Sequence, residues 1–142
     1  MPKNQLRSGA HVVFSINLHI VFVTKYRRKV LTVAMLESIE KSMNIVLVAN
    51  QCKIIEFGGE PDHVHLLLDV HPDNNISVLV GSLKSVSSRM IGKDFPDEIK
   101  KTYRDRKGLW HDSKCIVSCG GAALEIVKKY VSEQSGGRPD CV

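Results

Sequence analysis

The sequence predicts an α+β fold, a ferredoxin-like antiparallel sheet of βαββαβ order with its helices on one face. Three observations predict it. Apolar and polar residues alternate over positions 12–22, as in a half-buried strand. Segments 33–50 and 76–91 carry apolar residues at helical spacing. In segment 63–70, Val64, Leu66, Leu68 and Val70 all fall on one side, as a sheet covered by helices on one face requires.

Length and composition restrict the class of protein. The 142 residues suffice for one domain, residues 1–142, and 43% hydrophobic with 25% charged residues is typical of a soluble globular protein. An excess of 20 Lys and Arg over 15 Asp and Glu gives a formal charge of +5, which favours nucleic acid over a membrane surface as partner. The cysteines form no C-x-x-C pair and no targeting segment is recognisable, so we expect a cytoplasmic protein with reduced thiols.

The N-terminal half is expected to hold a strand, a helix and a hairpin. Residues 1–10 are polar and basic and are expected to form a flexible arm. One long strand over 12–22 follows, and it ends in a basic run around Tyr26. After the helix at 33–50, two strands enclose a stretch dense in turn residues, Gly58-Gly59-Glu60-Pro61-Asp62. We expect a hairpin with a longer loop, its strands being 53–57 and 63–70.

The C-terminal half is expected to complete the sheet and to add one helix. Helix 76–91 precedes a charged, irregular stretch, 92–108, and a fourth strand is expected at 109–119. Gly120-Gly121 then breaks the chain before a last helix, 122–134, and residues 135–142 are expected to form a loose tail. The last helix is an addition to the βαββαβ order, and the open face of the sheet is a surface that it could cover.

His63 and His65 are the first candidate functional residues. They lie at i and i+2 on one strand, so they project from the same face, roughly 7 Å apart at Cα. Val64, Leu66 and Leu68 point to the opposite face. Two neutral imidazoles on one face can converge on a metal ion, whereas the alternative is a pair of surface histidines that alternate by chance.

Two histidines do not complete a coordination shell. Gln134 is a candidate for a further ligand, and it lies four residues after Tyr130 on the same face of the last helix. By periodicity alone, Tyr130 is better explained as a core residue beside Val127 and Val131, and the alternative for Gln134 is a solvated helix end.

Five stretches in this order, covering nearly the whole chain, resemble a known family: residues 19–31, 57–70, 76–89, 109–110 and 117–134. The most specific combination is the PDHVHLL segment around His63 and His65 with a downstream K-x-Y-x-x-x-Q helix. The chain resembles the single-tyrosine HUH transposases of the insertion-sequence 200/605 family (transposase A type).

The resemblance implies an activity and the residues that carry it. His63 and His65 would bind a divalent ion, Mg²⁺ or Mn²⁺, with the help of Gln134. Tyr130 would attack the phosphorus of single-stranded DNA, which gives a 5′-phosphotyrosine and a free 3′-OH. The family acts on single-stranded, hairpin-bearing element ends as homodimers, in which the tyrosine helix of one subunit completes the site of the other.

The resemblance also raises the expectation of DNA contacts on two basic surfaces. The first is the run after the first strand, and the second is the polar face of helix 76–91. His19 shares a strand face with Asn17 and is a possible neighbour of the active site. The candidate DNA-contacting residues are Lys25, Tyr26, Arg27, Arg28, Lys29, Lys84, Ser85, Ser88 and Arg89.

Two alternatives remain beside a transposase. Non-catalytic modules with ferredoxin-like sheets bind single-stranded nucleic acid by stacking bases on aromatic side chains, but only 6% of this chain is aromatic. A domesticated relative that processes repetitive hairpins would use the same catalytic residues, so the sequence does not separate it from a transposase.

Overall fold

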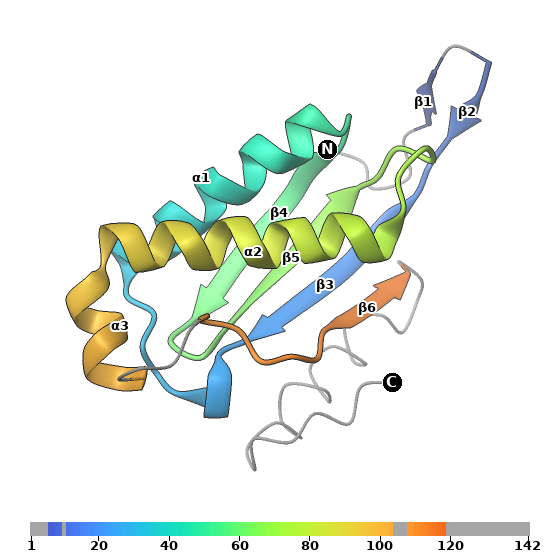
Figure 1. Cartoon of the computed structure of the whole chain (residues 1–142). Coiled ribbons are helices and arrows are strands. Elements are labelled where there is room, and N and C mark those ends of the chain that lie inside the picture. Colours follow the sequence, from blue (N-terminus) through green and yellow to red (C-terminus); the bar gives the residue numbers. More distant parts are fainter. Residues whose placement is uncertain (1–5, 10, 104–107, 119–142) are drawn as a thin grey trace.

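A four-stranded antiparallel sheet with two long helices on one face forms the body of the computed structural model (Figure 1), which describes residues 6–9, 11–103 and 108–118. The sheet order is β4-β5-β3-β6, and all neighbouring strands are antiparallel. This order confirms the predicted ferredoxin-like fold. Its strands are β3 (Asn17–Val23), β4 (Lys53–Glu60), β5 (His63–Asp69) and β6 (Cys115–Ser118), and its long helices are α1 (Val33–Ala49) and α2 (Ile76–Asp94).

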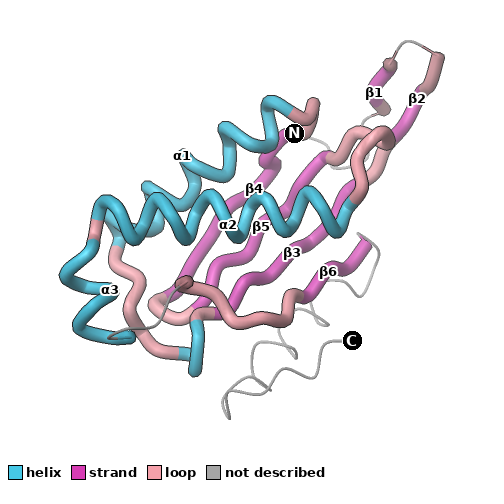
Figure 2. Tube along the Cα trace, viewed as in Figure 1, coloured by secondary structure: helices cyan, strands magenta, loops and turns pink. Residues whose placement is uncertain are grey.

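The alternating patterns of β3 and β5 place the main core between the sheet and the helices (Figure 2). Ile20 of β3 and Leu66 of β5 are paired in register, and both are fully buried against the helices. Thr32 and Asn75 cap α1 and α2, each accepting a hydrogen bond from a backbone N–H three residues on. The opposite face of β5 carries His63 and His65, as the alternation predicts.

The first predicted strand is divided in two. Val13–Phe14 (β2) pairs with Arg7–Ser8 (β1) in a separate two-stranded sheet, and only Asn17–Val23 joins the main sheet. The expectation of a flexible arm is therefore wrong at Arg7–Ser8. Phe14 packs against side chains outside the main core. The Arg7 guanidinium lies 4.8 Å from the centroid of its ring, and the centroid of the His71 ring lies 4.9 Å from it. Alternation alone cannot show that a run of residues changes partners.

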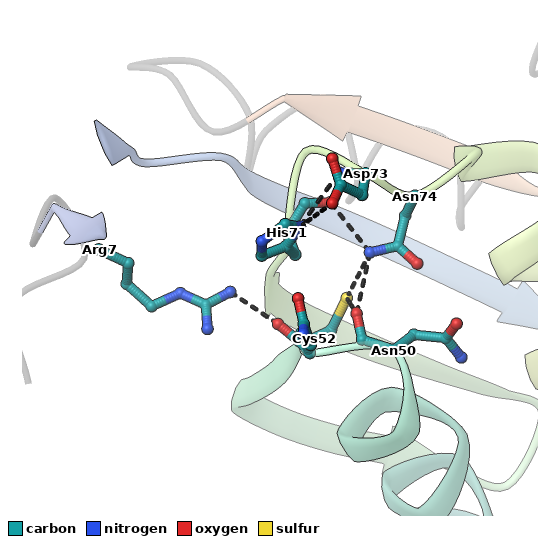
Figure 3. Close-up of polar contacts among 7 residues, drawn as sticks. Arg7, Asn50, Cys52, His71, Asp73 and Asn74 are labelled. Atoms are coloured by element: carbon teal, nitrogen blue, oxygen red, sulfur yellow. Dashed lines mark hydrogen bonds and ion pairs between the residues drawn. The ribbon is translucent and has the colours of Figure 1, made fainter. Parts of the chain in front are cut away.

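Side-chain contacts bind this N-terminal sheet to the segment after α1 and to the end of β5, and Figure 3 shows Arg7 reaching the segment after α1. Arg7 donates from Nη2 to the Gln51 carbonyl at 2.8 Å, and its Nε lies 3.0 Å from Oδ2 of Asp69. The Asn74 amide donates to the carbonyls of Asn50 and His71. An ion pair and several hydrogen bonds thus fix the end of the sheet that lies away from His63.

The β4–β5 hairpin is tighter than predicted. β4 continues through Gly58 and Gly59 to Glu60, and only Pro61-Asp62 form the turn. The two glycines serve close packing instead of the turn: a Cβ on Gly59 would lie 2.5 Å from Leu36 Cδ2 of α1. The prediction failed because glycine marks both turns and close approaches.

Two further differences lie in the region predicted to be irregular or extended. Pro96–Tyr103 forms helix α3, with Pro96 at its first position and two acidic residues in its first turn, both favourable at a helix N-terminus. The last strand is shorter than 109–119: Trp110 makes only an isolated bridge with Thr24, and its Nε1 donates to Ser87 Oγ at 2.9 Å.

The remaining expectations fall on other segments. Among the helices that the structure describes, none has the length and apolar character needed to cross a membrane. The predicted helix 122–134 and the tail 135–142 lie outside the described residues.

Candidate active site

The two histidines of β5 lie side by side on the face of the sheet that α1 and α2 leave open. Their ring centroids are 6.3 Å apart and the ring planes are inclined by 34°. With a metal–nitrogen distance of ~2.1 Å, two imidazoles on one ion have centroids at most about 6.4 Å apart. The observed spacing lies just within this limit, which a nearly linear arrangement of nitrogen, metal and nitrogen would reach.

Gly58 is the residue that makes room for His65. It pairs with His65 across the β4–β5 ladder, and a Cβ at this position would lie 2.5 Å from Nε2 of the imidazole. The ring of His65 therefore lies directly over the backbone of β4. Any side chain at position 58 would therefore displace the His65 ring from its present position.

Asp62 joins the site to the rest of the fold. Its residue surface is only 6% exposed, and its Oδ1 accepts a hydrogen bond from His63 Nδ1 at 2.8 Å. Oδ2 accepts from Arg27 Nε at 2.7 Å. Burial alone would raise the pKa of Asp62, but the hydrogen bonds and charges of His63 and Arg27 outweigh it and lower the pKa. Asp62 is therefore a carboxylate at neutral pH.

His65 is held in its neutral form. Loss of hydration is the largest cause of its lowered pKa, followed by the positive charges of His63 and His19, while Glu56 and Glu60 oppose the shift. A neutral imidazole has a free nitrogen lone pair, which a metal ion requires. His19 is thus close enough to act electrostatically on His65, as expected of a neighbour of the site.

The donor set fits a divalent ion that also takes oxygen ligands. Within residues 6–9, 11–103 and 108–118, no group of three or more His, Cys, Asp or Glu side chains could hold a metal. The two imidazoles suit Mn²⁺ better than Mg²⁺, which prefers an all-oxygen shell. Tyr130 and Gln134, the predicted nucleophile and third ligand, lie outside the described residues.

The structure brings the two predicted DNA-contacting surfaces together. Lys25, from the basic run, and Lys84, Ser85 and Ser88, from α2, line one cavity of about 410 Å³ beside Lys114. Burial, followed by the charge of Lys114, lowers the pKa of Lys84, whereas Asp112 opposes the shift. The lining of the cavity is basic, with three lysines and one carboxylate, that of Asp112. A groove of this kind suits a phosphate backbone.

Several of these side chains also have structural partners. Lys84 donates to the carbonyls of His111 and Asp112, and Ser88 accepts from the backbone N–H of Leu109. Arg27 is engaged by Asp62, whereas Tyr26 is 52% exposed. The remaining predicted contacts are exposed: Arg28, Lys29, Ser85 and Arg89.

Sequence reasoning missed two residues of the site, Gly58 and Asp62, and assigned Arg27 only to DNA. Asp62 was read as a turn residue, although its place directly before His63 was a signal for a side chain that orients the imidazole. Gly58 carried no separate signal, because its role depends on which strand lies beside β5.

Gly58→Ala is expected to weaken metal binding while leaving the fold intact. The three atoms nearest to the new methyl group all belong to the imidazole of His65, the end of a movable side chain, so we expect the ring to shift and the backbone to stay. We expect Mn²⁺ affinity to fall about 10-fold, as when a metal ligand loses its orientation. Gly81→Ala on α2 is the matched control, since its Cβ would meet nothing within 4 Å. Unchanged Mn²⁺ affinity in Gly58→Ala would contradict the assignment.

Comparisons with known proteins identify the family. Residues 12–134 match the family described as "Transposase IS200 like". The chain is 32% identical over 128 residues to the transposase for insertion sequence element IS200 of Salmonella typhimurium, covering 90% of this chain and 82% of that protein. It is 27% identical over 130 residues to the ISDra2 transposase TnpA of Deinococcus radiodurans, with 92% and 91% covered.

Solved structures show the same fold. A crystal structure of a transposase-like protein from Deinococcus radiodurans superimposes with a TM-score of 0.81 at 26% identity and covers 90% of this chain and 97% of its own. A REP-associated tyrosine transposase bound to a REP hairpin gives 0.59 at 12% identity, with 91% and 74% covered, and shares the fold. Because the family match spans most of the sequence, this chain belongs to the IS200-like transposase family.

Proposed function

We propose that this chain cleaves and rejoins single-stranded DNA through a 5′-phosphotyrosine on Tyr130, with a divalent ion held by His63, His65 and Gln134. The observation that carries the proposal is the histidine pair, with both rings on the open face of the sheet and 6.3 Å apart. The lowered pKa of His65 supports it, because a neutral ring is ready to bind a cation. Family membership supports the reaction class.

The proposed reaction is a transesterification. The Tyr130 oxygen attacks the scissile phosphorus, the bond from phosphorus to the 3′ oxygen breaks, and the 3′ end leaves as a hydroxyl. The proton lost by tyrosine balances the one gained by the leaving oxygen. A bound divalent ion would stabilise the charge on the phosphate and on the leaving oxygen. The phosphotyrosine conserves the bond energy, so another 3′-OH can reverse the step and join a new junction.

The substrate would approach along the basic groove between α2 and residues 108–114. Lys25, Lys84 and Lys114 can neutralise successive phosphates, and the exposed Tyr26, which lines a second cavity that also includes Lys25, can stack on a base. We propose hairpin-bearing ends of a mobile element as the natural substrate, in line with the relative that was solved with a REP hairpin. We also propose a homodimer in which Tyr130 of one subunit serves the histidines of the other.

The decisive experiment is covalent capture. The protein is incubated with a random single-stranded DNA library labelled at its 3′ end, because a 5′-phosphotyrosine retains the 3′ fragment. With Mn²⁺ we expect a labelled band that survives SDS, and sequencing of the captured DNA would give the cleavage site. Chelation by EDTA and use of the annealed duplex are expected to remove the band. A band that is equally strong in EDTA would contradict the metal site, and no band under any condition would contradict the activity.

A further inference from the structure

Asp62 is the one carboxylate in contact with His63 among the described residues. It occupies the turn between β4 and β5, and its side chain is almost fully buried. One carboxylate oxygen contacts His63 Nδ1 at 2.8 Å and the other contacts Arg27 Nε at 2.7 Å. Neither the cleavage chemistry nor the DNA contacts proposed above uses this pair of contacts.

The contact with Asp62 determines where His63 carries its proton. An ionised carboxylate only accepts hydrogen bonds, so Nδ1 of His63 must be the donor. In a neutral imidazole the other nitrogen, Nε2, is then left with a free lone pair. Because His63 is only 14% exposed at its side chain, the same bond also limits rotation of the ring.

Arg27 is in turn aimed at Asp62 by an unusual backbone. Tyr26 and Arg27 have φ angles of 57° and 52°, a left-handed backbone conformation that residues other than glycine rarely adopt. Such conformations persist when the surroundings determine them, and they concentrate at functional sites. Here Thr24 supplies the anchor, since its backbone N–H donates to the Asp62 carbonyl and its carbonyl accepts from the Arg27 backbone N–H. Its hydroxyl lies 2.7 Å from the Arg28 carbonyl and 3.1 Å from the Asp62 carbonyl.

We propose that Asp62 and Arg27 are positioning residues of the metal site. Asp62 holds His63 with its proton on Nδ1 and its Nε2 free for the ion, and Arg27 holds Asp62 in place. The metal part of this inference rests on the proposed function, whereas the protonation state of His63 does not. Arg27 thereby acts on the metal site through the carboxylate of Asp62. By its place in the basic run alone, it would be assigned only to DNA binding.

Asp62→Asn is the sharpest test, because it keeps the shape of the side chain and replaces one acceptor with a donor. The amide cannot accept from both His63 and Arg27. If its oxygen stays with Arg27, its NH₂ group faces His63 Nδ1, which can then only accept, so the proton moves to Nε2. This tautomer cannot bind an ion through Nε2.

Two measurements on the whole chain report the effect. Nitrogen-15 NMR of the metal-free protein, above the titration range of its histidines, is expected to show His63 protonated on Nδ1 in the wild type and shifted toward Nε2 in Asp62→Asn. Mn²⁺ titration followed by electron paramagnetic resonance is expected to show about 10- to 100-fold weaker binding. Arg27→Lys, which lacks the Nε–H donor, should change both readouts in the same direction and by less.

Asp69→Asn is the matched control. Asp69 is at the other end of β5 and is also paired with an arginine Nε, in this case Arg7, but it does not contact His63 or His65. It should leave the His63 tautomer and Mn²⁺ affinity unchanged. Wild-type values of both readouts in Asp62→Asn would overturn the inference. Failure of the wild type to bind Mn²⁺ would instead overturn the proposed function, and the NMR result would still decide which nitrogen of His63 carries the proton beside Asp62.

Discussion

Replacing Tyr130 by phenylalanine is expected to abolish the covalent protein–DNA adduct. The substitution removes only the phenolic oxygen, so DNA and metal binding should persist while the group that attacks phosphorus is lost. Loss of the nucleophile lowers the rate of the reaction more than loss of any single supporting contact does. We therefore expect at least a ~1000-fold reduction in adduct formation. The measurement is the yield of SDS-stable adduct with 3′-labelled single-stranded DNA and Mn²⁺.

The chain supplies its own controls, because it contains three tyrosines. Tyr103 is buried, donates from its hydroxyl to the Lys25 carbonyl, and has its pKa raised by burial, all of which make it a poor nucleophile. Tyr26 is exposed beside the basic groove and is the one credible competitor. Tyr26→Phe and Tyr103→Phe should retain the adduct. Its loss in Tyr26→Phe but not in Tyr130→Phe would show that the nucleophile has been misassigned.

The parts of the fold that could be predicted are those in which local pattern and final environment agree. Alternation in β5 places Val64 and Leu66 in the core and His63 and His65 outside it, because strand geometry allows no other arrangement once the helices cover one face. The helical spacing in α1 and α2 was informative for the same reason: Ile39 and Leu83 meet the sheet as their positions require.

The parts that failed depend on partners distant in sequence. From the sequence alone, Gly58 is interpreted as a turn residue. Its role beside His65 depends on the pairing of β4 with β5, which the local pattern does not show. Arg27 reads as a DNA contact until the fold brings it to Asp62, 35 positions along the chain. The strand predicted over 12–22 divides because Phe14 finds cover in Arg7 and His71, a contact that alternation does not encode. Tyr130 and Gln134 keep the roles that the family resemblance gives them, as predictions.

His65→Ala is expected to remove metal binding and cleavage together without unfolding the protein. The residue is exposed and its ring lies over Gly58, so truncation leaves no cavity and stability should change by no more than about 0.5 kcal/mol. Mutation of a residue that only supports a metal ligand typically lowers metal affinity about 10- to 100-fold. Loss of the ligand itself should therefore weaken Mn²⁺ binding by more than about 100-fold. His71→Ala, beyond the other end of β5, is the control and should bind Mn²⁺ as the wild type does. Full cleavage by His65→Ala would contradict the metal site.

Mixing two inactive variants then tests how the active site is assembled. In a two-fold dimer with composite sites, a Tyr130→Phe subunit paired with a His65→Ala subunit has one site that lacks both residues and one that is intact. Random exchange of subunits should therefore restore about a quarter of wild-type adduct yield per site, since half of the dimers are mixed. If each subunit used its own tyrosine, every site in the mixture would lack one residue and no adduct would form. The label should also reside entirely on the His65→Ala chain, which retains Tyr130, and a size tag on that chain would show it directly.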